Sequence, residues 1–263
     1  MFRLKFKLLR MLLLTPLEQF QLISLFSINL FHLDFSITSI LVIGGLMLIF
    51  LSFFFWFSAA HDKTFYVIPN NWQIIFETVY TIVPQLLFDN LNKKGEFYLP
   101  FILTTFLFIM LSNLIGLVPY SFTVTSHVIV TFTLSLTVFI GVNIISISTY
   151  KSKMLSLFIP ANTSIGLAVL LVPIEFISYI FKPISLGVRL FANLMAGHTL
   201  LKVIVGFSWT MVLLNGFVLP FLHVVPLFIL ILLFGLELGV ALIQAYVFTI
   251  LSCIYLNESI NLH

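Results

Sequence analysis

Long apolar stretches with few charges restrict this chain more than any other feature of its sequence. Between Phe158 and Leu256 the only charged side chains are Glu175, Lys182, Arg189, Lys202 and Glu237. About 20 apolar residues in a helix cross the hydrocarbon core of a bilayer, and a backbone in lipid must satisfy its own hydrogen bonds. We therefore predict an all-α integral membrane protein.

The composition agrees, because 61% of the residues are hydrophobic and 8% are charged, against roughly 25% charged in soluble domains. No segment remains for a soluble catalytic domain, so we expect no catalytic site of the chain's own, no metal and no cofactor. The net charge of +3 comes from Lys and Arg beside apolar runs, where such residues set membrane topology. Nucleic acid is therefore not an expected partner. The single Cys253 excludes an internal disulfide.

Residues 1–263 are predicted to form a single membrane domain. Its expected parts are an N-terminal segment 1–36, a transmembrane helix 37–57, an amphipathic helix 70–92, a transmembrane hairpin 97–150 and a long tilted helical hairpin 158–258. The first 14 residues resemble a short targeting segment that we expect to be retained. The amphipathic helix is expected in the membrane interface. The alternative is a short span that is broken at Pro84.

Basic residues beside the predicted spans indicate the orientation. The turn around Pro119 carries none, whereas the other ends of the spans carry Lys63, Lys93, Lys94, Lys151 and Lys153. By the positive-inside rule the lysine side faces the matrix or cytoplasm. Four basic residues in the N-terminal segment oppose this orientation, so it rests on five charges against four.

Polar residues in the last hundred positions indicate two long antiparallel helices that meet near Asn215-Gly216. In such a pair, residues at equal height have a constant sum of residue numbers. The numbers of Arg189 and Gln244 add to 433, and those of His198 and Glu237 add to 435. Half of either sum falls close to the turn. The register predicts that His198 and Glu237 lie within direct or one-water reach of each other.

Arg189 stands in the middle of the first of these helices. A guanidinium at bilayer depth costs about 2.5–3.5 kcal/mol and cannot escape by deprotonation. Asn193, one turn later, shares its face, and Glu175 faces nearly the same way about 21 Å along the helix. Gln244 and Glu237 share a face of the second helix. The expected result is a polar path that is interrupted by one permanent cation.

Each of these residues also has a structural explanation. His198 and Glu237 are alternatively a hydrogen-bonded structural pair, and Glu175 is alternatively a carboxylate at the headgroup boundary. Lys182 and Lys202 are expected to extend toward the interface. The remaining histidines are expected in loops or at the interface. Small residues on the second helix predict close approach of another helix backbone: Gly235, Gly239, Ala241 and Ala245.

Five sequence motifs carry a resemblance to a known family. They are TPLEQF, FLFIMLSNLIGLVPYSFTVTSH, SLGVRLFANLMAGH, GLELGVALIQAYVFTIL and CIYLNESINLH. The chain resembles subunit a of the F-type ATP synthases, in its mitochondrial form. The similarity runs from Thr15 to His263 and is weakest over residues 22–70.

The resemblance implies a stator subunit in the mitochondrial inner membrane, with several transmembrane helices. Its expected partners are the ring of c subunits, the peripheral stalk, other membrane subunits and a cardiolipin-containing bilayer. By this resemblance Arg189 faces the ring carboxylate. His198, Glu237, Asn193 and Gln244 match the outer half-channel, and Glu175 matches the matrix half-channel. Protons are the transported ion.

Two other classes of membrane protein fit the sequence less well. A haem-bearing subunit needs paired helical histidines, and His198 and His223 have no matching second pair. A secondary transporter is expected to show internal repeats around a midplane site. The polar residues of this chain instead lie in one C-terminal hairpin.

Overall fold

The structure is a computed structural model. It describes residues 20–22, 24–27, 29–30, 33–34, 36–60, 71–118, 123–151, 165–213 and 224–260. The predicted targeting segment, Lys63, Lys153 and the turn near Asn215-Gly216 lie outside the described residues.

Two short two-stranded antiparallel sheets precede helix α2. Strand β1 (Ser24–Phe26) pairs with β4 (Ile37–Thr38), and β2 (Asn29–Leu30) pairs with β3 (Leu33–Asp34). The expectation of helices alone did not include these strands. The sequence did contain a strand pattern, because apolar and polar residues alternate from Leu33 to Thr38. This alternation has the two-residue period of a β-strand.

Helices α2 (Ser39–Ala60) and α3 (Asn71–Leu91) follow the strands. Helix α3 continues through Pro84 and is absent from the described helices that are apolar enough to cross a membrane. Its buried residues Val83, Leu87 and Leu91 recur every four positions, so they form one stripe. This stripe packs toward α4 and α8, whereas Glu77 and Asp89 are exposed. These features favour the amphipathic helix over a broken span.

The hairpin consists of α4 (Leu99–Gly116) and α5 (Val128–Tyr150). The 3-10 segment η3 (Asn92–Tyr98) leads into α4, whose first turn contains a proline, as is common because that position needs no donor. A second 3-10 segment, η4 (Val124–Ser126), comes directly before α5.

Two long helices complete the fold. Helix α6 (Ile165–Leu213) has 49 residues and α8 (Val224–Ile260) has 37, or about 74 Å and 56 Å at 1.5 Å per residue. Both lengths exceed the roughly 30 Å of a hydrocarbon core, so neither helix fits within one core along the membrane normal. Helix α6 remains continuous through Pro173 and Pro183. Four helices in the described part of the chain, α4, α5, α6 and α8, are long and apolar enough to cross a membrane.

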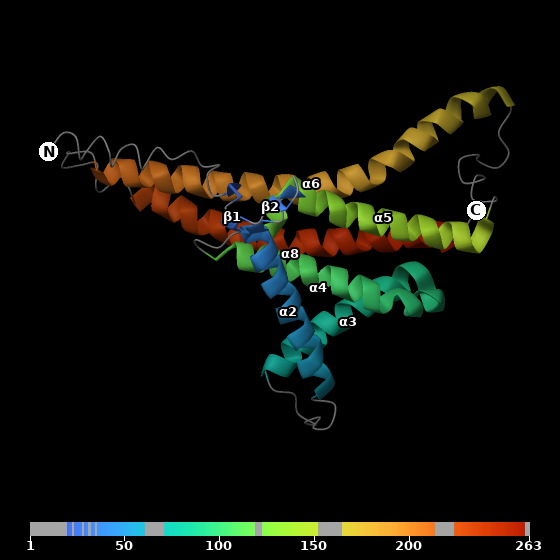
Figure 1. Cartoon of the computed structure of the whole chain (residues 1–263), viewed down its shortest axis with the longest axis horizontal. Coiled ribbons are helices and arrows are strands. Elements are labelled where there is room, and N and C mark those ends of the chain that lie inside the picture. Colours follow the sequence, from blue (N-terminus) through green and yellow to red (C-terminus); the bar gives the residue numbers. More distant parts are fainter. Residues whose placement is uncertain are drawn as a thin grey trace.

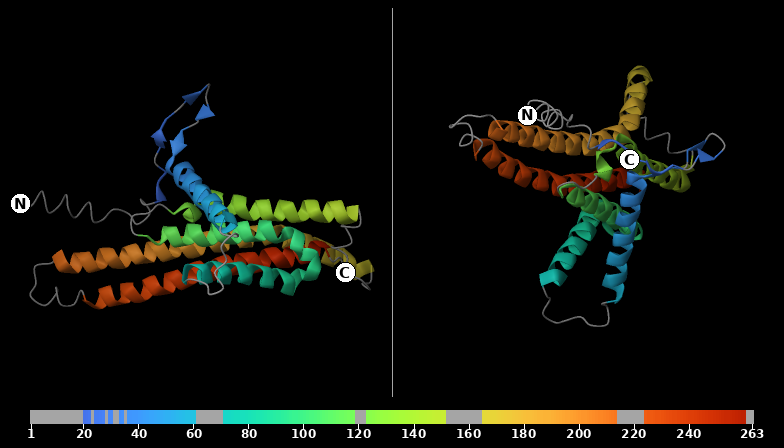
Figure 2. Two further views of the ribbon diagram at one scale, coloured as in Figure 1. Left: turned by 90° about the horizontal axis from the view of Figure 1, so that it is seen from below. Right: turned by 60° about the vertical axis from the view of Figure 1, so that its left-hand side comes forward.

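Helix α8 is the centre of the bundle and packs against α3, α4, α5 and α6. Helices α4, α5, α6 and α8 lie side by side along the long axis, while α2 crosses them (Figures 1 and 2). The N-terminal part of α6, yellow in Figure 1, bends away from α5 and α8. Helices α5 and α6 approach closely at Gly187, where a Cβ would lie 2.8 Å from Ser135 Oγ and 3.2 Å from the Thr131 carbonyl oxygen.

Candidate functional site

An acid and a histidine meet between the two long helices. Nδ1 of His198 on α6 lies 3.2 Å from Oε1 of Glu237 on α8. The Glu237 residue is only 5% exposed. The antiparallel register therefore predicted their proximity correctly.

Gly197 makes room for this pair. A Cβ at position 197 would lie 2.7 Å from Oε1 and 3.1 Å from Cδ of Glu237. The carboxylate thus rests against the backbone of α6, in space that any side chain at this position would occupy. Apart from this 3.2 Å contact, the Glu237 oxygens and His198 Nε2 are buried without a hydrogen-bond partner among the described residues. Burial of such polar atoms costs free energy.

A second polar contact joins the same helices about one and a half to two turns away. Asn193 Nδ2 donates a hydrogen bond of 2.9 Å to Gln244 Oε1. Gln244 is buried, whereas Asn193 is exposed on α6. The partner of Gln244 in this structure is therefore Asn193 and not Arg189, although the register placed Arg189 at nearly the same height.

Arg189 lies on an exposed flank of α6. The buried residues Leu186, Leu190 and Leu194 form a stripe that faces the bundle. Arg189 is about 100° around the helix from Leu190, so it borders this stripe without entering it. Within the described residues, no carboxylate lies within ion-pair distance of Arg189. The Arg189 guanidinium is thus accessible to a partner that binds this flank of α6.

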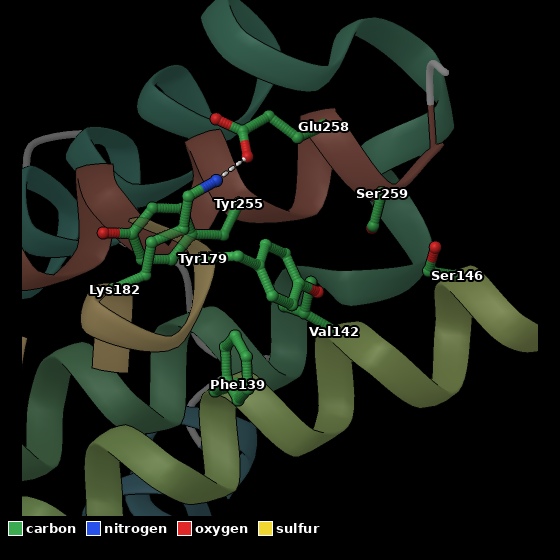
Figure 3. Close-up of a pocket in the computed structure, with 8 residues that line it drawn as sticks. All are labelled: Phe139, Val142, Ser146, Tyr179, Lys182, Tyr255, Glu258 and Ser259. Atoms are coloured by element: carbon green, nitrogen blue, oxygen red, sulfur yellow. Dashed lines mark hydrogen bonds and ion pairs between the residues drawn. The ribbon is translucent and has the colours of Figure 1, made fainter. Parts of the chain in front are cut away.

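Lys182 is neutralised by a residue that the sequence analysis missed. It forms an ion pair with Glu258 near the end of α8, and its Nζ lies 5.3 Å from the Tyr179 ring centroid and 5.2 Å from that of Tyr255 (Figure 3). The expectation that Lys182 extends toward the interface stays a prediction. The antiparallel register could have predicted this pair. The residue numbers 182 and 258 add to 440, close to the sum of 435 for His198 and Glu237.

Glu175 stands apart from the other candidates. It is partly buried on the N-terminal part of α6, the part that bends away from the bundle (Figure 1). Because α6 is continuous, the 14 residues between Glu175 and Arg189 correspond to about 21 Å along the helix. None of the other predicted site residues contacts Glu175 through a bond or ion pair described for this structure.

A buried polar cluster lies at the end of α4. Asn113 Nδ2 donates to the Ala241 carbonyl oxygen at 3.3 Å, and Thr125 Oγ1 donates to Asn113 Oδ1 at 3.1 Å. These bonds tie α4, η4 and α8 together. The sequence analysis did not select these residues, although the segment is rich in Ser, Thr and Asn. The described residues contain no group of three or more His, Cys, Asp and Glu side chains that could hold a metal ion.

The small residues of α8 divide into two sets. Ala241 and Ala245 are buried within the chain. A Cβ at Gly235 or Gly239 would meet no atom within 4 Å. The close approach predicted from the small residues is therefore internal at the alanines, while the two glycines face open space.

Gly197→Ala is expected to uncouple Glu237 from His198. The added Cβ displaces the carboxylate, which is the flexible end of a side chain, so the amount of folded protein changes little. A displacement of this kind reduces reactions that need exact geometry by about 10- to 100-fold. Proton flux per folded molecule in reconstituted membranes measures this effect. Gly206→Ala on the same helix is the control, because its Cβ would meet nothing within 4 Å; equal flux in the two variants would contradict the prediction.

Comparison with known proteins gives one consistent family. The sequence model described as ATP synthase A chain matches residues 40–257. A protein of Pylaiella littoralis named ATP synthase subunit a is 52% identical over 249 residues, which cover 95% of this chain and 99% of that protein. Its namesake in Chondrus crispus is 47% identical over 253 residues (95% and 97%), and that of Brassica napus is 44% identical over 256 residues (95% and 97%).

Proposed function

Because this chain belongs to the ATP synthase A chain family, we propose that it is the stator subunit that conducts protons to and from a rotating ring of c subunits. It provides two offset half-channels in the mitochondrial inner membrane. It has no catalytic site of its own, and it couples proton flow to ATP synthesis through rotation. Its other partners are the peripheral stalk, neighbouring membrane subunits and cardiolipin-containing lipid.

The observation that carries this proposal is the position of Arg189. A permanent cation lies mid-helix in an apolar segment, exposed, with no carboxylate at ion-pair distance in the described chain. Facing lipid alone, it would cost about 2.5–3.5 kcal/mol. A carboxylate on a partner in the membrane removes that cost. The ring carboxylate is such a partner.

The opposing charges explain how protons exchange at the ring. A ring carboxylate crosses lipid in its protonated form, because the ionised form is too costly there. Beside Arg189 the ionised form is favoured, as it is for any carboxylate within about 4–6 Å of a cation. The carboxylate therefore releases its proton when it arrives at Arg189. It takes a new proton as it leaves.

His198 and Glu237 deliver the new proton from the outer side. Their 3.2 Å separation permits direct transfer between the imidazole and the carboxylate. The Asn193–Gln244 hydrogen bond continues the polar path toward Arg189 without adding a charge. Each proton that enters gains about 2.3 kcal/mol per 100 mV of membrane potential.

The released proton leaves on the matrix side past Glu175. Its position about 21 Å from Arg189 separates the exit from the entry at His198, which lies on the other side of Arg189 along α6. Arg189 lies between the two half-channels. Its charge repels protons and prevents direct leakage from one half-channel to the other.

Photocrosslinking in the assembled complex tests the partner on the Arg189 flank. Ala196 is exposed and lies two turns from Arg189 on nearly the same face. A photoreactive amino acid at Ala196 is expected to label the c subunit. The control is Ile140 on α5, which is 52% exposed and is expected to label lipid. Labelling of lipid alone from Ala196 would overturn the assignment of this face to the ring.

A further inference from the structure

Helix α6 comes close to the backbone of α5 at Gly187, which is buried. A Cβ at this position would lie 2.8 Å from Ser135 Oγ, 3.2 Å from the Thr131 carbonyl oxygen and 3.3 Å from Cα of Phe132. Two of these three atoms belong to the α5 backbone, which cannot turn aside as the end of a flexible side chain can. A side chain at position 187 would therefore move the two helices apart by a few tenths of an ångström.

Atomic size, and not a hydrogen bond, sets the separation of the helices at this contact. Thr131 Oγ1 donates to the Val128 carbonyl oxygen at 3.1 Å. Ser135 Oγ donates to the Phe132 carbonyl oxygen at 2.9 Å. Both hydroxyls are thus satisfied within α5. Small residues let helix backbones come close in a membrane, and the missing side chain of Gly187 determines how close they come here.

Arg189 lies on the opposite side of α6 from this contact. Two residues turn a helix by about 200° and advance it by about 3 Å. Arg189 therefore points almost directly away from the α5 backbone, at nearly the same height as Gly187. The burial agrees, because Gly187 is buried and Arg189 is exposed. The distance from Arg189 to a partner on its flank thus depends on where α5 holds α6.

We propose that Gly187 is a positioning residue for Arg189, and that the α5 backbone behind it determines how far the guanidinium reaches toward the ring. This inference rests on the proposed function, since the ring carboxylate is the group on which Arg189 acts there. The position matters because the attraction between two charges depends on their distance. A misplacement of about 1 Å in a reacting constellation costs about 100-fold in rate.

Gly187→Ala tests the proposal by moving α6 away from α5 and Arg189 toward the ring. ATP synthesis per assembled complex is expected to fall about tenfold. Gly206→Ala on the same helix is the control, because its Cβ would meet no atom within 4 Å, and it is expected to retain synthesis. Equal synthesis per complex in the two variants would overturn the proposal.

The pH profile separates a positioning role from a purely structural one. A closer guanidinium favours the ionised ring carboxylate, so proton uptake from the outer side then requires a lower outer pH. At an effective dielectric constant of about 20, shortening a separation of about 4 Å by about half an ångström corresponds to about 0.3–0.4 pH unit. The outer pH of half-maximal synthesis is expected to fall by this amount in Gly187→Ala, relative to the unchanged chain.

The profile is measured at fixed matrix pH and fixed membrane potential. Helix α5 carries no charged residue. The charged and titratable groups of α6 and α8 in this region are the same in both proteins: Lys182, His198, Glu237, Tyr255 and Glu258. A purely structural role of Gly187 would lower the amount of complex and leave the midpoint unchanged. An unchanged or higher midpoint would therefore overturn the proposal.

Variants of Ser135 test the same contact from α5 and leave Arg189 and its helix untouched. Ser135→Thr adds a methyl group beside the 2.8 Å contact and is expected to lower the midpoint even if Gly187→Ala does not assemble. Ser135→Ala removes the oxygen, and together with Gly187→Ala it is expected to recover part of the lost synthesis. Thr137→Ala is the control, because it removes an exposed hydroxyl that donates within α5. A double variant no better than Gly187→Ala would contradict the proposal.

Arg189→Ala is measured in parallel to separate this inference from the proposed function. If Arg189→Ala abolishes synthesis while Gly187→Ala changes neither synthesis per complex nor the midpoint, the inference fails and the proposed function stands. If Arg189→Ala leaves synthesis intact, the proposed function fails.

Discussion

Arg189→Ala is expected to abolish proton-driven ATP synthesis while the complex still assembles. The side chain lies on an exposed flank of α6, and the packing residues Leu186 and Leu190 are untouched. Without the guanidinium, no nearby positive charge stabilises the ionised form of the ring carboxylate opposite the stator. ATP synthesis in energised membranes, divided by the amount of assembled enzyme, measures the effect.

Val188→Ala is the matched control. Val188 is the neighbouring residue, is 48% exposed, and carries no charge, so synthesis is expected to persist. Arg189→Lys is expected to lose ATP synthesis, as Arg189→Ala does. An ammonium lacks the planar five-donor fork of a guanidinium and loses its proton more readily when buried. Appreciable coupled synthesis in a fully assembled Arg189→Ala enzyme would refute the role proposed for this residue.

Exchange of His198 and Glu237 is expected to recover proton flux that either single change loses. His198→Glu alone places two carboxyl groups together, and Glu237→His alone places two imidazoles together. Like groups this close disfavour the second charge, so each single variant is expected to lose about 10- to 100-fold of flux. The double variant restores one acid and one imidazole at the 3.2 Å contact.

The comparison of the four proteins isolates the coupling between the two positions. Flux is measured per assembled complex, with the Asn193–Gln244 pair left intact as an internal reference for the α6–α8 contact. A double variant that conducts no better than the worse single variant would show that the two residues act independently. The hydrogen-bonded structural pair would then be the better description.

Helical periodicity and the scarcity of charge were sufficient to predict much of this protein. The apolar stretches predicted a membrane protein built mainly of helices. They are long enough to cross the hydrocarbon core of a bilayer, where the backbone must satisfy its own hydrogen bonds. The sum of residue numbers predicted that His198 and Glu237 are neighbours, because two straight antiparallel helices have a single register. It also placed Gln244 near the correct height, within one turn of its partner Asn193.

Only the tertiary structure decided which flank of each helix meets a neighbour. Periodicity shows that Arg189 and Asn193 share a face, but the packing of α6 on α5 and α8 leaves Arg189 exposed and pairs Lys182 with Glu258. The polar cluster of Asn113 and Thr125 was missed because its link to the Ala241 carbonyl oxygen spans 128 residues and depends on how α4 docks on α8. The physical reason is that the sequence determines local geometry along one helix, whereas the rotation and crossing of helices depend on all the contacts that they form together.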